Sequence, residues 1–135
     1  EKVYPCLRFF GWKSADLLPD IFMESDVGLV LYPKGAVNSL TNKFFEYLAG
    51  SLPIVSTLSA EEPCQLLRES RTGINCMPGD SDSVYNALCH FSKLKKNGLL
   101  EAEKVRCRRF FENSYGIKKI YERFSLFVEE IVGLR

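Results

Sequence analysis

Short, mostly apolar runs alternate with amphipathic segments along the first part of the chain. The runs CLRFFGW (6–12), DVGLVLYP (26–33) and LPIVST (52–57) each suit a strand buried on both faces. TGINCMP (72–78) predicts a weaker strand before a Pro-Gly turn. Buried strands that alternate with helices favour a parallel sheet.

Between and after these runs, apolar residues recur at helical spacing. They predict helices within 14–26, 42–49 and 60–70, from 80 or 81 onward, and at 99–113 and 117–131. Ser14 or Asp16 is placed to cap the first of these, and Asp80 or Ser81 the fourth. The last helix has the clearest period, with one stripe formed by Ile117, Ile120, Tyr121, Phe124, Phe127, Val128 and Ile131. Such a stripe must lie against something apolar, and it favours self-association where it is bare.

The pattern therefore predicts the α/β class, a Rossmann-like parallel sheet flanked by helices with a helical C-terminal segment. With 135 residues, 46% of them hydrophobic and 26% charged, the chain can build one compact core. We expect 1–135 to be one domain or part of one. Ligands of such sheets bind at the carboxyl ends of the strands, so the loops after Phe10, Leu31, Thr57 and Cys76 are the places to search.

Charge and cysteine usage narrow the classes of partner. The formal net charge is +1, which makes a nucleic-acid partner unexpected. Five widely spaced cysteines and a lone His90 fit neither a disulfide framework nor a zinc site, and His90 is interpreted as a half-buried structural residue. Without a span of roughly 20 apolar residues or a signal-peptide layout, we expect a cytoplasmic protein.

The stretch SLTNKFFEYLAGSLPIVST (39–57) carries the most informative chemistry. A helix over 42–49 presents Phe44, Phe45, Leu48 and Ala49 on one arc and Asn42, Lys43, Glu46 and Tyr47 on the other. Ser39 and Thr41 precede its first turn, where free N–H groups and the positive end of the helix dipole suit a phosphate. One turn further on, Glu46 suits the hydroxyls of a ribose. The alternative is that Glu46 pairs with Lys43 on a solvated face.

The segments LPDIFMESDVGLVLYP, NSLTNKFFEYLAGSLPIVST, GINCMPGDSDSVYNAL and FFENSYGIKKIYERFSLFVEEI, in this order, resemble one enzyme family. They are similar to the C-terminal, donor-binding domain of the retaining group 1 glycosyltransferases (family GT4), which have the two-domain GT-B fold. The resemblance covers about residues 9–132. It implies a transferase that moves a sugar from a nucleoside-diphosphate sugar to an acceptor hydroxyl, in polysaccharide or glycolipid biosynthesis. It also implies no cofactor and no essential metal.

The resemblance also assigns roles to residues. The second glutamate of the family's Glu-x7-Glu element, which bonds the ribose hydroxyls, matches Glu46, whereas the first falls on Asn38 and so loses its charge. The diphosphate turn matches 40–42, with Thr41 where many members have proline. Gly11 and Trp12 match a stretch beside the base; the alternative is a turn in which Trp12 covers the core edge. The expected donor-binding residues are Gly11, Trp12, Asn38, Ser39, Leu40, Thr41, Asn42, Lys43 and Glu46, and no residue is a convincing catalytic base.

A complete enzyme of this family also has an N-terminal acceptor domain and two earlier strands with a basic pair that clamps the diphosphate. Because 1–135 matches neither, we expect a partial domain that is inactive by itself and needs that acceptor domain as a partner. The strand at 6–10 would lack its usual neighbour, so it pairs elsewhere or with another copy. A basic cluster over 93–109 is read as a solvated face, with peripheral contact to anionic lipid as the alternative.

Two other classes fit part of the pattern. A non-catalytic receiver-like interaction domain would need an aspartate at the end of the strand within 26–33, where Tyr32 stands. A catalytically silent sugar-nucleotide-binding domain shares every feature above and differs only in activity. Hydride chemistry on a dinucleotide is poorly supported because no GxGxxG occurs.

Overall fold

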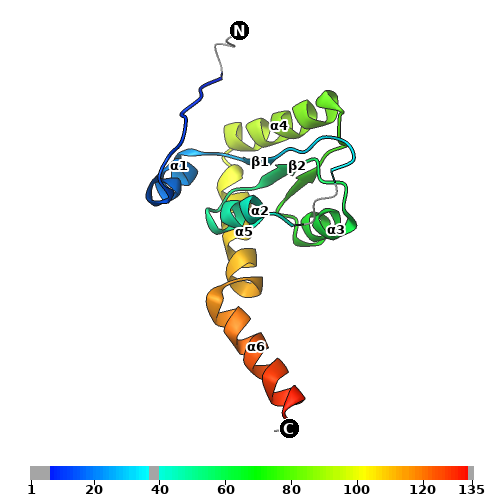
Figure 1. Ribbon diagram of the computed structural model, residues 1–135. Helices are drawn as coiled ribbons and strands as arrows, with labels where there is room; N and C mark the ends of the chain where they lie inside the picture. The colour runs from blue at the N-terminus through cyan, green and yellow to red at the C-terminus, as the bar shows by residue number, and fades with distance from the viewer. Residues whose placement is uncertain (1–6, 37–39, 134–135) are drawn as a thin grey trace.

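Three short parallel strands form the centre of the molecule in a computed structural model that describes residues 7–36 and 40–133 (Figure 1). The strands are β1 (Gly28–Val30), β2 (Ile54–Ser56) and β3 (Gly73–Asn75), in the order β1-β2-β3. Leu29 pairs with Val55, and Val55 pairs with Ile74. The predicted α/β class with a parallel sheet is therefore confirmed.

Helices cover both faces of this sheet. The helices of the described residues are η1 (Ala15–Leu17), α1 (Leu18–Glu24), α2 (Asn42–Ala49), α3 (Glu61–Ser70), α4 (Ser81–Lys96), α5 (Leu100–Ser114) and α6 (Ile117–Ile131). Figure 1 shows α4 on one side of the sheet and α2 and α3 on the other. The core is divided in the same way. Val30, Phe44, Leu48, Ile54, Leu58, Leu67 and Cys107 form one buried cluster, and Val55, Cys76, Ala87, Phe91 and Leu100 form the second.

Several helix boundaries follow the predictions from the sequence. Helix α2 occupies 42–49 as expected. Asp80 caps α4, because its Oδ1 accepts hydrogen bonds from the N–H groups of Asp82 (3.0 Å) and Ser83 (3.1 Å). The expected cap of the first helix is wrong: the Ser14 hydroxyl donates to Asp16 Oδ2 (3.3 Å), and neither side chain caps η1 or α1.

The predicted strand at 6–12 is wrong for the residues that the structure describes. Residues 7–12 form no strand, and the side chain of Phe9 is 89% exposed. A strand needs a neighbouring edge, and no described residue pairs with the open edge of β1. Leu29 is also 41% exposed, so β1, unlike β2, is not buried on both faces. An apolar run is buried only where another layer covers it.

Helix α6 extends away from the sheet and the other helices (Figure 1). It packs on α5 near its start, and none of its residues is buried. The apolar stripe of α6, which the sequence pattern predicted to lie against an apolar surface, therefore faces solvent in the part of the chain that the structure describes.

Candidate functional site

The carboxyl ends of β1 and β2 are tied together by a single threonine. The backbone N–H of Tyr32 donates to Thr57 Oγ1 (2.7 Å), and that hydroxyl donates to the carbonyl of Tyr32 (2.9 Å). The N–H of Thr57 also donates to the carbonyl of Val30 (3.1 Å). These three hydrogen bonds join the carboxyl ends of β1 and β2, which is the end of the sheet where ligands of α/β folds bind.

We expect Thr57→Val to lower the free energy of unfolding by about 2 kcal/mol, because it leaves the Tyr32 N–H and carbonyl unpaired beside a 5%-exposed side chain. Thr57→Ser keeps the hydroxyl and is the matched control. Urea unfolding of both variants measures the difference. A loss for Thr57→Ser as large as that for Thr57→Val would mean that the hydroxyl contributes no more than the methyl group does, which would contradict this expectation.

An open cavity of about 400 Å³ lies at the same edge. Three loops meet there, those after β1, after β2 and before α4. Its lining residues are Leu31, Tyr32, Pro33, Thr57, Gly79, Asp80, Ser81 and Val84. One carboxylate oxygen of Asp80 already holds two N–H groups of α4, so this residue stabilises the helix start as well as lining the cavity.

Helix α2 begins at the carboxyl end of β1 and has an open first turn. Asn42 and Lys43 are exposed, and no described residue accepts a hydrogen bond from the backbone N–H of either. The next N–H group, that of Phe44, donates to the carbonyl of Thr41 (3.0 Å). Two donors at the positive end of the helix dipole therefore have no acceptor among the described residues and can serve a ligand.

The start of α2 has no side-chain cap from Thr41. Thr41 occupies the N-cap position, but its side chain makes no capping bond. Its Oγ1 is buried and has no hydrogen-bond partner among the described residues. The backbone of Thr41 is extended, as is usual at an N-cap, but its side chain accepts no hydrogen bond from the first N–H groups of α2.

Glu46 lies one helical turn beyond Asn42 and is exposed. It forms no ion pair with Lys43 in the described part of the chain, so the paired alternative does not occur in this structure. Tyr47, which the helical arc placed with the polar side chains, instead packs its ring on Gly28. Burial, assisted by the neighbouring Glu46 carboxylate, raises the pKa of Tyr47.

The direction of α2 is fixed at both ends by its neighbours. Phe44 is fully buried, and the ring of Phe45 lies edge-on to Tyr115 at the end of α5 (4.9 Å between centroids). At the C-terminus, Arg108 Nη1 donates to the carbonyl of Ala49 (2.6 Å). These contacts hold the open first turn and Glu46 in place relative to the sheet.

The other expected donor-binding residues have different outcomes. Leu40 is partly buried against the core, so only its backbone is available to a ligand. Asn38 and Ser39 lie outside the described residues. Gly11 has a positive φ of 66° in the exposed segment that leads into η1, and Trp12 is 89% exposed. The alternative in which Trp12 covers the core edge is therefore wrong, whereas its contact with a base stays a prediction.

Metal-ligating and nucleophilic chemistry has little support in the described residues. Cys64, Cys76, Cys89 and Cys107 are free thiols, and no group of His, Cys, Asp or Glu side chains in 7–36 and 40–133 could hold a metal ion. Burial raises the pKa of Cys107 to about 12, so its thiol stays protonated at neutral pH. His90 is exposed rather than half-buried and lies edge-on to Phe91 (5.3 Å).

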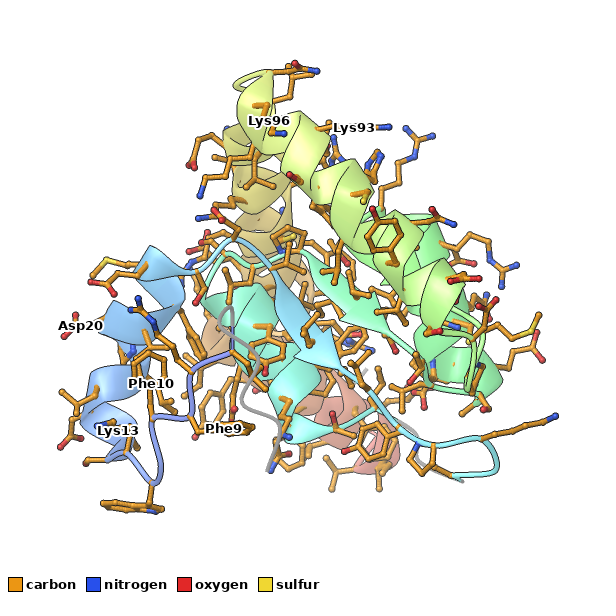
Figure 2. All side chains as sticks on the ribbon, turned by 90° about the horizontal axis from the view of Figure 1, so that it is seen from above. Phe9, Phe10, Lys13, Asp20, Lys93 and Lys96 are labelled. Carbon is orange, nitrogen blue, oxygen red and sulfur yellow. The ribbon has the colours of Figure 1, made fainter. Side chains whose placement is uncertain are left out.

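Carboxylates partly neutralise the basic cluster. Lys95 pairs with Asp26 (2.6 Å), and Arg106 and Arg108 pair with glutamates on their own helix. Lys93 and Lys96 lie toward the C-terminal end of α4 and point outward (Figure 2). Phe9 and Phe10 lie beside α1, away from these two lysines (Figure 2).

Sequence reasoning did not assign roles to Thr57 or to the Tyr32 backbone. The available signal was a threonine immediately after a wholly buried strand, at the edge where loops converge. The Thr57 hydroxyl can bond the backbone of Tyr32 only because β1 and β2 end beside each other in the sheet. Where the two strands end relative to each other depends on the β1–β2 register, which cannot be read from the sequence pattern.

Comparison of the chain with models of known protein families, with curated proteins and with solved structures gave no match. None of the helices in the described part of the chain is both long enough and apolar enough to cross a membrane.

Proposed function

We propose that the chain is the nucleotide-sugar-binding part of a cytoplasmic glycosyltransferase. The observation that carries the proposal is the open first turn of α2 with the exposed Glu46 one turn away, which forms no ion pair with another described residue. The likeness of NKFFEYLAGSLPIVST to the donor domains of group 1 glycosyltransferases adds the substrate class.

In this proposal the diphosphate binds at the start of α2. The N–H groups of Asn42 and Lys43 donate to phosphate oxygens, and the helix dipole and the Lys43 ammonium add positive charge. By the family resemblance, the backbone of Leu40 would also meet the diphosphate. Asn38, which lies outside the described residues, replaces the carboxylate that the family has near the sugar.

Glu46 accepts hydrogen bonds from the two ribose hydroxyls. A carboxylate repels phosphate, so its place one turn from the diphosphate suits a neutral diol better than a second anion. Hydrogen bonds to a charged acceptor are stronger than neutral ones, and they fix the nucleoside relative to the helix. Trp12 and Gly11 are proposed to contact the base.

During transfer, the bond between the sugar's anomeric carbon and the diphosphate breaks, and the diphosphate keeps the electron pair. A new bond forms to the acceptor oxygen, whose proton passes to an oxygen of the leaving diphosphate. The start of α2 stabilises the charge that develops on the leaving diphosphate, which is electrostatic catalysis of a common kind. The acceptor site and the basic pair of the family are proposed to lie on an N-terminal acceptor domain and earlier strands.

Calorimetric titration with UDP-, GDP- and ADP-sugars tests this proposal. One of the three is expected to bind, and Glu46→Ala should weaken that binding roughly tenfold to a hundredfold, because it removes charge-assisted hydrogen bonds. Inorganic pyrophosphate should bind Glu46→Ala at least as well as wild type, since the lost residue serves the ribose.

Glu24→Ala is the matched control. Glu24 is an exposed helical glutamate at the end of α1, just before β1 and hence at the opposite edge of the sheet. It should bind nucleotide sugars like wild type. Equal affinity of the wild type and Glu46→Ala would remove Glu46 from the site and overturn the proposal.

A further inference from the structure

The apolar stripe of α6 is not used by the proposed function. Phe124 is 60% exposed and Phe127 58%, and no described residue of the chain covers them. Beyond its start on α5, the helix extends away from the sheet and the other helices (Figure 1), and none of its residues is buried.

The stripe has the spacing of a coiled-coil seam. Ile120, Phe124, Phe127 and Ile131 follow one another at intervals of four, three and four residues, the d-a-d-a pattern of a heptad. Arg123 and Glu130 occupy the two g positions beside it. Both are exposed, and neither forms an ion pair with another described residue.

We propose that α6 pairs with α6 of a second copy of this chain in an antiparallel coiled coil. In this arrangement Phe124 lies opposite the second copy's Phe127, and Ile120 lies opposite its Ile131. Two-fold symmetry repeats both layers. The two folded bodies then lie at opposite ends of the helix pair, where they do not obstruct each other.

Charge complementarity selects this register. With these core layers, each Arg123 faces the Glu130 of the second copy, so the dimer gains two opposite-charge pairs. Sliding the helices by one heptad places Arg123 opposite Arg123, or Glu130 opposite Glu130. A parallel pair places Arg123 opposite Val128. Only the proposed register pairs both Arg123 and Glu130 with an opposite charge. The two antiparallel registers shifted by one heptad place like charges opposite each other.

The contact area indicates a weak dimer. The half-exposed side chains of the stripe would bury roughly 500 Å² per chain. Stable interfaces bury about 800 Å² per partner, so a dissociation constant on the order of 10 µM is expected. The dimer is independent of any ligand, so its failure would leave the proposed nucleotide site unaffected.

Sedimentation velocity at chain concentrations from roughly 1 to 300 µM, which span that constant, tests the proposal. Wild type should pass from monomer to dimer over this range. Phe124→Glu should remain a monomer throughout. Lys118→Glu changes an exposed residue outside the seam and should dimerise like wild type.

Two charge variants test the antiparallel register. Arg123→Glu and Glu130→Arg should each dimerise about tenfold more weakly alone, because each places two like-charge pairs at the interface. An equimolar mixture restores two opposite-charge pairs and should dimerise as well as wild type. A monomeric wild type, or a mixture no better than its components, would overturn the proposal.

Discussion

Replacement of Phe44 by alanine is expected to lower the free energy of unfolding by about 3–5 kcal/mol. Phe44 is fully buried in the cluster that joins α2 to β1, β2, α3 and α5. Truncation removes its transfer free energy and leaves a cavity that fully buried neighbours such as Leu48 and Ile54 cannot fill. Since small domains are stable by about 5–15 kcal/mol, a large share of the stability would be lost.

Equilibrium unfolding in urea, followed by far-ultraviolet circular dichroism, measures this change. Phe9→Ala is the control of the same chemistry, because its ring is 89% exposed and its loss should change stability by less than about 0.5 kcal/mol. Similar losses for the two variants would mean that α2 does not dock on the sheet through Phe44.

The second large effect is expected at Gly73, where a side chain would meet backbone. A Cβ at this residue would lie 2.2 Å from the carbonyl oxygen of Ile54. Both residues are paired in the parallel ladder, so neither can move without disturbing the β2–β3 hydrogen bonds. Gly73→Ala should therefore lower stability by about 3 kcal/mol, at the upper end of overpacking effects.

Thermal unfolding can compare this clash with backbone at Gly73 to a clash with a side chain at Gly28. A Cβ at Gly28 would meet the ring of Tyr47 at 2.3 Å, and a side chain can shift where a ladder carbonyl cannot. Gly73→Ala should lower the melting temperature by roughly 10 °C, and Gly28→Ala by roughly half as much. An equal or smaller shift for Gly73→Ala would contradict the described pairing of β3.

The elements that sequence predicted best are those whose signals are local. The 42–49 helix follows from apolar spacing, and Asp80 as a cap follows from side-chain chemistry beside a turn. The strand at 54–56 is wholly buried as its apolar run indicated. The helix and its cap depend on contacts between residues that are close in the sequence. The strand depends on the helical layers that a wholly apolar run must have on both of its faces.

The predictions that failed depend on distant neighbours. Residues 7–12 are apolar enough for a strand, but the open edge of β1 has no described partner. The side chain of Tyr47 turns to β1 because Gly28 leaves room for its ring, a fact about another segment. For the candidate site, spacing placed Asn42 and Glu46 on one surface, but it could not show that Thr41 leaves the helix start uncapped.

Amide chemical shifts test directly the proposal that the first turn of α2 binds a diphosphate. On titration of ¹⁵N-labelled protein with the nucleotide sugar that binds, the amide signals of Asn42 and Lys43 should move the most. The corresponding nucleoside without phosphates should leave both nearly unchanged. Large shifts confined to the cavity around Tyr32 and Asp80, with Asn42 and Lys43 unaffected, would show that the ligand does not bind at the start of α2.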